Sequence, residues 1–365
     1  PGLAELCGVR VVRRDILSVS GEIEERWRPG DAGRLGEDGR LPLYQMGNNR
    51  YHKGVWRLAH ETAGVLTLHD LVLHHLLIEL TLAEGDYAGY RRWLTTDHGW
   101  LGEAVAGARK FVDPGQSAMF GLAARRTLLR RQRGVLVHSR WAARTVLEAD
   151  DEIAVRVVPM GVPLPAPIDT EASAAWRRRI GVPDEAPLIG SFGFQTPIKR
   201  TDRAVLALAR EELADVHLAV GGEISERLDL AELAAEAGVG DRVHFLGFLD
   251  FQEFEAAIGA CDVCLNLRYP TAGETSASLL RELAVGRPAI VSDYAQFAEL
   301  PDRVAVKVPL GDKEVEAIAA VVGGLLRDRE RLARMGAAAR EFVAHHHAPA
   351  RAAAAVAEVC ASRAV

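Results

Sequence analysis

Residues 188–200 read Leu-Ile-Gly-Ser-Phe-Gly-Phe-Gln-Thr-Pro-Ile-Lys-Arg. The stretch opens with a short, mostly apolar run, 188–194, which is typical of a strand buried on both faces of a parallel sheet. The run ends at a glycine turn around Gly193, and a helical pattern over residues 201–210 follows. A strand, a turn and a helix in this order form the unit from which parallel α/β sheets are built.

The same alternation extends in both directions through the 365 residues of the chain. Further strands are expected at 9–12, 41–46, 64–69, 134–138, 154–159, 216–220, 242–246, 263–267, 289–292 and 304–308. This pattern predicts an α/β fold with two Rossmann-like, doubly wound domains. We expect the domains to face each other across a cleft, where ligands bind at the carboxyl ends of the strands.

Four prolines in residues 159–167 mark the boundary between the two domains, because proline continues neither a helix nor a central strand. We therefore predict an N-terminal domain over 1–160, a linker over 161–169 and a C-terminal domain over 170–345. The Ala-rich end, 346–365, is predicted to be a helix that crosses back to the N-terminal domain.

The composition excludes several classes of protein. Hydrophobic residues make up 48% and charged residues 26% of the chain, as in an ordinary folded protein rather than a disordered or collagenous one. A net charge of −6 gives no nucleic-acid signature. Four cysteines are too few for a disulfide framework, and no run reaches the roughly 18 apolar residues of a membrane span. We expect a cytoplasmic protein.

Lys199 stands at the start of the helix that follows the quoted strand. A cation is disfavoured there by the helix dipole, so its presence favours an anionic ligand at the carboxyl end of the strand. The alternative is a solvated Lys-Arg pair, Lys199 and Arg200, with no ligand.

A second candidate site lies in residues 273–282, which read Gly-Glu-Thr-Ser-Ala-Ser-Leu-Leu-Arg-Glu. Glu274 precedes the expected helix, and Glu282 lies about two turns into it. The backbone amides between them point out of a helix N-terminus, where phosphate binds; they belong to Thr275, Ser276, Ala277 and Ser278. The alternative makes Glu274 a helix-terminal charge and Glu282 a surface residue.

Taken together, residues 187–310 resemble the nucleotide-binding domain of family 4 glycosyltransferases, which are retaining enzymes of the GT-B fold. The matching features are the turn from Gly193 to Lys199, Gly221-Gly222, the Val-His-Phe-Leu-Gly-Phe of 243–248, the pair Glu274/Glu282 and residues 283–293. The segment Gly-Asn-Asn-Arg-Tyr-His at 47–52 resembles a bacterial branch of the same family.

The resemblance implies a binding site for a nucleotide-sugar donor. Lys199 would contact the diphosphate, Glu282 the ribose and Glu274 the transferred sugar, with Phe248 and Leu249 beside the base. The other implied donor residues are Gly193, Arg200, Gly221, Thr275, Ser276, Ala277 and Ser278. Phe194 departs from the family, many of whose members have an arginine there; Arg200 or backbone amides would substitute for it.

In the first half, His69 resembles the strand-end histidine with which the family faces the donor sugar. Four nearby polar residues, Asn48, Asn49, His52 and Asp70, together with Arg140, are predicted to lie on the acceptor side. The alternative for the asparagines is an Asn-rich turn. His69, His74 and His75 lack a metal-ligand spacing, and we predict no metal site.

The window between Asp113 and Glu148 contains no acidic residue and seven arginines, from Arg125 to Arg144. One interpretation is a basic face that contacts either the inner membrane surface or a lipid-diphosphate acceptor. The alternative is a solvated helix with no such partner. Residues 1–6 look like the end of a helix, so the family's first strand and Gly-rich loop are expected to be missing.

The function predicted from the resemblance is retaining transfer of a hexosyl group from a nucleoside diphosphate sugar to an acceptor hydroxyl, in glycan, polysaccharide or glycolipid synthesis. Lys199 and the helix N-terminus would stabilise the leaving diphosphate without a metal or other cofactor, with His69 and Glu274 at the sugar. Two alternatives stay open. One is a nucleotide-sugar epimerase or phosphorolytic enzyme of the same fold, and the other is an inactive sugar-nucleotide or protein-binding module.

Overall fold

The computed structural model describes residues 12–13, 25–26, 41–113 and 115–361. The chain divides into two compact units, each considered by itself below. Unit 1 comprises Pro1–Met160, Ala272–Thr275 and Ala350–Val365, and unit 2 comprises Gly161–Thr271 and Ser276–Pro349. The first boundary falls inside the proline-rich stretch, at Met160.

Unit 1 is built on a parallel four-stranded sheet of order β3-β4-β5-β6. The strands are β3 (Leu43–Met46), β4 (Val65–Leu68), β5 (Gly134–Val137) and β6 (Val155–Val157). Its helices are α2 (Lys53–Glu61), α3 (His74–Leu80), α4 (Tyr87–Ala108), α5 (Gly115–Gly121), α6 (Arg126–Arg130), α7 (Arg140–Ala149) and α15 (Pro349–Ala361). Two short strands, β1 (Val12–Arg13) and β2 (Glu25–Arg26), pair with each other in parallel.

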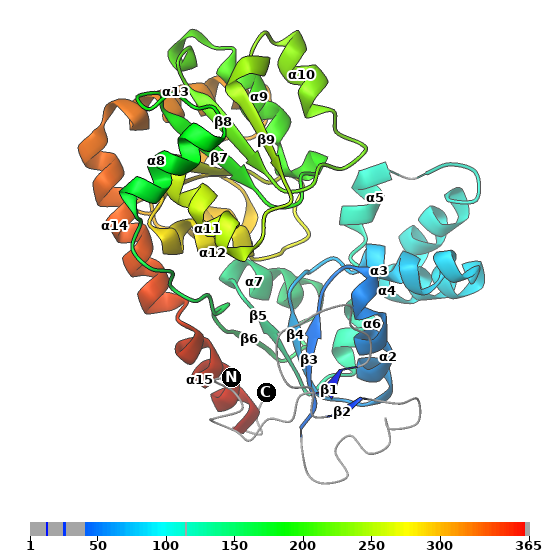
Figure 1. Ribbon diagram of the computed structural model, residues 1–365. Helices are drawn as coiled ribbons and strands as arrows, with labels where there is room; N and C mark the ends of the chain where they lie inside the picture. The colour runs from blue at the N-terminus through cyan, green and yellow to red at the C-terminus, as the bar shows by residue number, and fades with distance from the viewer. Residues whose placement is uncertain (1–11, 14–24, 27–40, 114, 362–365) are drawn as a thin grey trace. The chain divides into compact units, whose positions relative to one another are not determined.

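The sheet of unit 1 is sandwiched between helices because its central strands are apolar on both faces. Every residue of β4 and β5 is buried. The last helix of the chain, α15, supplies part of this packing: Val356 joins a cluster with Val65, Leu136 and Val158, and Figure 1 shows the helix running beside this sheet. The chain reaches α15 through a break after His346, where α14 (Arg329–His346) ends.

Unit 2 contains a parallel six-stranded sheet of order β12-β11-β10-β7-β8-β9. The strands are β7 (Leu188–Phe192), β8 (His217–Gly221), β9 (Val243–Gly247), β10 (Val263–Asn266), β11 (Ala289–Ser292) and β12 (Ala305–Val308). Six further helices complete the unit beside α14, and Figure 1 shows them on both faces of the sheet. They are α8 (Thr170–Arg179), α9 (Thr201–Leu208), α10 (Leu230–Glu236), α11 (Phe251–Ala260), α12 (Ala277–Val285) and α13 (Glu314–Arg327), and α12 packs against α11.

The strand order of unit 2 creates a switch point between β7 and β10. The chain runs outward from β7 to β9 and then returns to the other side of β7, where β10 pairs with it. The connections after β7 and β10 therefore lead away in opposite directions, which leaves room for a ligand at the carboxyl ends of these two strands. The loops that follow Phe192 and Asn266 occupy this place.

The described strands coincide with the apolar runs of the sequence, and the prediction of an α/β fold with parallel sheets is confirmed. The expected strand at 9–12 overlaps the described residues only at Val12, in β1. Residues 1–6, and with them the expectation of a missing first strand and loop, lie outside the described residues. No helix in the described part of the chain is long and apolar enough to span a bilayer.

Candidate functional site

The turn after β7 brings the Lys199 ammonium back to the end of the strand. Lys199 is the last residue of a short 3-10 helix, Pro197–Lys199, and its Nζ donates a hydrogen bond to the backbone oxygen of Phe192 at 2.5 Å. Gly193 has a φ of 104°, and a Cβ there would stand 2.7 Å from Lys199 Nζ. The glycine therefore allows both the turn and the close approach of the ammonium to the backbone.

Gln195, which the sequence did not point to, supports the turn after β7 from inside the fold. Its side chain is completely buried, and its Nε2 donates to the backbone oxygens of Gly193 at 2.9 Å and Gly221 at 3.1 Å. Its Oε1 accepts from the Thr201 hydroxyl at 2.6 Å. A single amide thus fastens the turn after β7 to the end of β8 and to the start of α9. The only signal in the sequence is a polar residue two positions after the strand-end glycine.

The predicted donor residues Gly221 and Leu249 lie against each other. A Cβ on Gly221 would come within 2.9 Å of Leu249 Cδ1, so the absent side chain makes room for the loop after β9. The neighbouring Gly222 has a φ of 114°, and its Cβ would overlap the Gly193 carbonyl. The loops after β7, β8 and β9 are therefore packed at one edge of the sheet by glycines.

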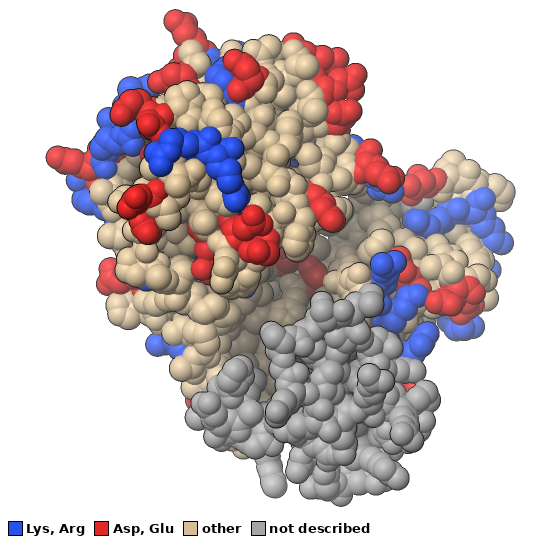
Figure 2. Space-filling model, viewed as in Figure 1, with Lys and Arg blue, Asp and Glu red and all other residues tan. Residues whose placement is uncertain are grey.

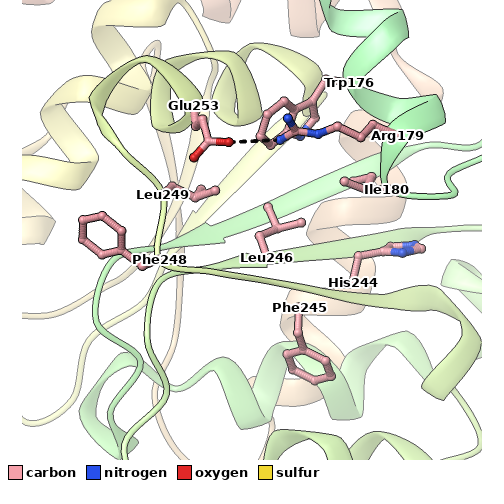
Figure 3. Close-up of a pocket in the computed structure, with 9 residues that line it drawn as sticks. All are labelled: Trp176, Arg179, Ile180, His244, Phe245, Leu246, Phe248, Leu249 and Glu253. Atoms are coloured by element: carbon pink, nitrogen blue, oxygen red, sulfur yellow. Dashed lines mark ion pairs between the residues drawn. The ribbon is translucent and has the colours of Figure 1, made fainter.

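Phe248 and Leu249 also line a pocket of about 440 Å³ beside β9. Figure 3 shows the pocket between α8, β9 and the start of α11, with an ion pair between Arg179 and Glu253 on one side. Phe248 is 75% exposed, so its ring is available to a ligand. Neither Lys199 nor Glu282 lines this pocket.

Glu282 is buried at the switch point and does not lie on the surface. Its exposure is 0%, and its Oε1 accepts a hydrogen bond of 3.0 Å from the side-chain amide of Asn266, at the end of β10. The same amide nitrogen lies 3.0 Å from the Ser278 hydroxyl. Asn266 was not predicted, although it is a polar residue at the end of an otherwise apolar strand.

The environment of Glu282 raises the pKa of its carboxyl to about 7. Burial is the largest cause; the Asn266 hydrogen bond and the positive charges of Lys199 and Arg268 act in the opposite direction. Glu282 Oε2 and Asn266 Oδ1 are both buried without a hydrogen-bond partner. When Glu282 is ionised, the site therefore offers two unsatisfied acceptors close to a lysine.

Helix α12 begins beside these groups. Ser276 is its N-cap and accepts a hydrogen bond from the Leu279 amide at 3.3 Å, while its hydroxyl lies 3.0 Å from that of Ser278. Ala277 is the exposed first residue of the helix. A Cβ on Gly193 would lie 4.0 Å from Ser278 Oγ. Four predicted donor residues thus converge at the carboxyl ends of β7 and β10: Gly193, Lys199, Ser278 and Glu282.

Glu274 and Thr275 belong to unit 1, although they immediately precede α12. Their segment is held by the backbone oxygen of Ala272, which accepts hydrogen bonds from the amides of Leu71 at 2.6 Å and Val72 at 3.0 Å. Gly273 lies so close to Leu71 that a Cβ would clash with that side chain. Glu274 is therefore placed next to the loop that follows His69 and Asp70.

Arg200 forms an ion pair with Glu314, which lies 114 positions away in the sequence. Its guanidinium forms a paired interaction with the buried carboxylate of Glu314, with Nε 2.6 Å from Oε1 and 2.9 Å from Oε2. Arg200 itself adopts a φ of 54° at the start of α9. A diphosphate would have to compete with Glu314 for this side chain, which weakens the expectation that Arg200 substitutes for the arginine missing at Phe194.

In unit 1, His69 lies at the end of β4 in a network of polar side chains. Its Nε2 is 2.8 Å from Gln45 Oε1, and its Nδ1 is 3.2 Å from Nε2 of His138, which follows β5. Burial, with the neighbouring His138 and His52, lowers the pKa of His69 to about 4. Gln45 and His138 were not predicted; their signal is a polar residue within or directly after a strand next to that of His69.

The segment after β3 is held by hydrogen bonds within itself and to the loop and helix that follow β4. Asn48 Oδ1 accepts from the Leu76 amide in the first turn of α3 at 2.9 Å, and Asn49 Oδ1 accepts from the Tyr51 amide at 3.0 Å. Asp70 Oδ2 accepts from the Asn48 amide at 2.7 Å, and His52 Nδ1 lies 3.0 Å from the Gln45 carbonyl. Asn49 therefore caps the turn Arg50–His52, whereas Asn48 connects the segment to α3, and the acceptor role of both residues stays a prediction.

Arg140 is the first residue of α7, directly after the N-cap Ser139, and it is exposed. Among the described residues, no group of three or more His, Cys, Asp or Glu side chains is arranged to hold a metal ion.

Burial removes Arg125 from the expected basic face over 125–144, whereas Arg126 and Arg130 are exposed but ion-paired. Arg125 is 7% exposed, and its guanidinium donates to the backbone oxygens of Leu71 and Thr145. Arg126 and Arg130 both pair with the buried carboxylate of Asp150. Local sequence suggested free charge because Asp150 lies just outside the acid-free window. At the right of Figure 2, around the α3–α5 part of unit 1, basic and acidic side chains lie side by side.

Comparison with known proteins gives a consistent result for unit 2. Residues 173–342 match the family described as glycosyl transferases group 1. A 2-deoxystreptamine glucosyltransferase from Streptomyces kanamyceticus is 30% identical over 62% of this chain and 60% of its own length. A D-inositol 3-phosphate glycosyltransferase from Stackebrandtia nassauensis is 34% identical over 39% of this chain and 34% of its own. The chain thus matches less than two thirds of the length of these relatives.

Two solved structures share the fold. Sucrose-phosphate synthase from Thermosynechococcus elongatus superimposes with a TM-score of 0.65 at 19% identity, covering 88% of this chain and 73% of that one. The Anabaena protein HepE in complex with UDP-glucose gives 0.63 at 16% identity, covering 92% and 90%. At these identities the likeness shows the fold alone, and it confirms the predicted GT-B architecture.

Proposed function

We propose that this chain transfers a glycosyl group from a nucleoside diphosphate sugar to an acceptor hydroxyl, on the premise that residues 173–342 form a group 1 glycosyl transferase domain. The relatives named above are both glycosyltransferases. The finer proposal, carried over from the resemblance to family 4, is that the sugar is a hexosyl group transferred with retention of configuration, without a metal.

The observation that carries this proposal is the convergence of Lys199, Ser278 and Glu282 at the switch point of unit 2. Lys199 acts on the pKa of Glu282, so the ammonium and the carboxyl are electrostatic neighbours. The site therefore combines a cation and a helix N-terminus, suited to a diphosphate, with unsatisfied acceptors suited to a diol. A nucleoside diphosphate presents both chemical features, phosphates and ribose hydroxyls, in a single molecule.

In the proposed reaction, the bond between the sugar and the diphosphate breaks and negative charge develops on the leaving phosphate oxygen. Lys199 and the first amides of α12 stabilise this charge, and loss of one such donor commonly costs about 10²–10³ in rate. Glu282 holds the ribose through its unsatisfied Oε2. Leu249 and Phe248 border the base. The acceptor oxygen bonds to the anomeric carbon on the face that the diphosphate leaves, and the hydroxyl proton passes to the leaving phosphate oxygen.

Unit 1 supplies the groups for the sugar and the acceptor in this proposal. His69 and Glu274 contact the transferred sugar; the placement of the Glu274 segment against Leu71, in the loop after His69, supports this pairing. Asp70, His52 and the exposed Arg140 serve the acceptor, which is a glycan or a lipid-linked molecule.

The first experiment measures nucleotide binding to the full chain. Uridine and guanosine diphosphates and their sugars are titrated by calorimetry into wild type, Lys199→Ala and the matched control Lys307→Ala, which removes a lysine from the edge strand β12. Hydrogen bonds to charged groups contribute about 1.5–3 kcal/mol, so Lys199→Ala should weaken binding by about 10- to 100-fold. Lys307→Ala should bind as wild type does.

The second experiment separates transfer from the alternatives. A nucleotide sugar that binds is incubated with a panel of hydroxyl acceptors, and products are followed by NMR, which also reports the anomeric configuration. Transfer with an α-donor giving an α-product supports the proposal. Epimerised donor or phosphate-dependent cleavage would replace it with the corresponding enzyme, and tight binding without any turnover would leave a binding module.

A further inference from the structure

We propose that His138 is a positioning residue that holds the proton of His69 on Nδ1, so that His69 presents an unprotonated Nε2 to a sugar hydroxyl. The contact with sugar rests on the proposed function, whereas the control of the proton by His138 rests on geometry alone. The two residues follow β4 and β5, which pair in parallel register with Val65 opposite Gly134, so both strands carry their histidine at the same level.

Three contacts connect the imidazoles to the backbone on one side and to an amide on the other. His138 Nδ1 lies 3.0 Å from the Val158 carbonyl oxygen, His138 Nε2 lies 3.2 Å from His69 Nδ1, and His69 Nε2 lies 2.8 Å from the Gln45 amide. The two rings are stacked, with centroids 5.1 Å apart and planes 29° apart.

The Val158 carbonyl fixes the direction of every hydrogen bond in this row. A carbonyl oxygen only accepts, so His138 must carry its proton on Nδ1. A neutral His138 then has a lone pair on Nε2 and accepts from His69, which must carry its proton on Nδ1 as well. The tautomer of an imidazole is set in this way by the partner of its other nitrogen. His69 is left with a lone pair on Nε2.

The last contact fits this assignment once the Gln45 amide makes a half-turn. Gln45 Oε1 faces His69 Nε2, and its Nε2 lies 3.1 Å from the Thr67 hydroxyl. A half-turn exchanges the amide oxygen and nitrogen, which are interchangeable in shape. The amide then donates to His69 Nε2 and accepts from Thr67, so that every group in the row has a complementary partner.

A doubly protonated His69 would also satisfy Gln45 Oε1, but its surroundings oppose the cation. Burial and the nearby His138 and His52 lower the pKa of His69 to about 4, and burial lowers that of His138 as well. His69 is therefore neutral at pH 7. Gln45 is exposed, so a hydroxyl that enters the site displaces its amide and donates to the same lone pair.

The consequence is a defined chemical role. With the proton held on Nδ1, His69 accepts a hydrogen bond and recognises a sugar through a hydroxyl hydrogen. With the proton on Nε2 it would donate instead, and the hydroxyl would have to present its oxygen. Loss of the His138 acceptor removes the constraint that selects the first state.

The experiment observes the tautomers directly by ¹⁵N–¹H correlation NMR on the full chain with labelled histidine. His69→Gln identifies the His69 signals. His138→Phe keeps a ring for stacking but removes the acceptor, and His138→Gln restores an acceptor close to the position of Nε2. His75→Phe, which alters an exposed histidine of α3, is the matched control.

The expected result is an Nδ1–H tautomer of His69 in wild type, in His138→Gln and in His75→Phe, and a gain of Nε2–H in His138→Phe. An Nε2–H tautomer in wild type overturns the inference, and this measurement needs no variant to fold beyond the one used for assignment. An unchanged Nδ1–H tautomer in folded His138→Phe overturns it equally.

Kinetics separate this inference from the proposed function. If both hold, His138→Phe lowers kcat by about 10- to 100-fold, by analogy with the loss of the outer hydrogen-bond partner of a metal-ligating histidine. Nucleotide binding changes little, and His138→Gln recovers most of the activity. If His69→Gln leaves transfer unchanged, the assignment of His69 to the sugar fails, while the NMR result still decides whether His138 controls its proton.

Discussion

Replacing Glu282 with glutamine should abolish a pH dependence that the buried carboxyl imposes on the stability of unit 2. Burial raises the pKa of Glu282 from 4.5 to about 7, even though the Asn266 hydrogen bond and the charges of Lys199 and Arg268 favour the ionised form. Glutamine has nearly the same shape, can still accept from Asn266 and carries no proton that titrates. The comparison therefore isolates the cost of charging this one group.

Proton binding sets the sign and the size of the effect. Between pH 4.5 and about 7 the folded protein keeps a proton on Glu282 that the unfolded chain has already released, so the free energy of unfolding falls as the pH rises. One pKa unit corresponds to about 1.4 kcal/mol, so wild type should lose about 3 kcal/mol relative to Glu282→Gln across this window. The difference stays constant below and above the window.

The assay follows urea unfolding at a series of pH values that brackets this window. Hydrogen exchange of the β10 and α12 amides reports unit 2 by itself, which avoids assuming that both units unfold together. Glu236→Gln, an exposed carboxyl on α10, is the control and should show no such change. A stability difference between wild type and Glu282→Gln that is independent of pH would refute the reasoning.

Two further predictions concern Gly193 in unit 2 and Arg125 in unit 1. Gly193→Ala should destabilise unit 2 by about 1–3 kcal/mol and weaken nucleotide binding, because its φ of 104° is strained for alanine and the Cβ would press on Lys199. Gly240→Ala is the control in the same unfolding and calorimetric measurements, because its new Cβ would lie 3.9 Å from the nearest atoms. Arg125→Gln should lower the thermal midpoint of unfolding, since the guanidinium is buried and donates to backbone oxygens. Co-sedimentation of the protein with anionic vesicles should not change. Loss of vesicle binding at unchanged stability would instead show that Arg125 belongs to a membrane-binding surface.

The parts of the site that could be predicted from sequence are those fixed by strand ends. Buried parallel strands are continuous apolar runs, so their carboxyl ends can be read off the chain, and parallel pairing brings those ends to one edge. Lys199 follows β7, while Ser278 and Glu282 follow β10, the neighbouring strand. Their convergence therefore follows from strand order together with local position.

The parts that could not be predicted depend on partners distant in sequence. Arg200 is bound by Glu314, 114 positions away, and Arg125 by the backbone of Leu71 and Thr145, none of which is visible in the local pattern. Asn48 was predicted on the acceptor side, and the local pattern gave no sign that its side-chain oxygen accepts from the Leu76 amide, 28 positions later. A polar side chain near a strand end serves either a ligand or the backbone, and only its contacts distinguish the two.

The contrast between Gln195 and Glu282 shows how that distinction works within one site. Both side chains are completely buried at the edge formed by β7 and β10. Gln195 uses both ends of its amide on backbone and Thr201, so its role is complete without a ligand. Glu282 keeps Oε2, and Asn266 keeps Oδ1, without any partner. An unsatisfied buried acceptor costs about 1–3 kcal/mol, and folding gains nothing from leaving two of them together. We infer that a hydroxyl-bearing ligand supplies the missing donors. Glu282 and Asn266 are then the residues through which this site recognises its ligand, whereas Gln195 supports the fold.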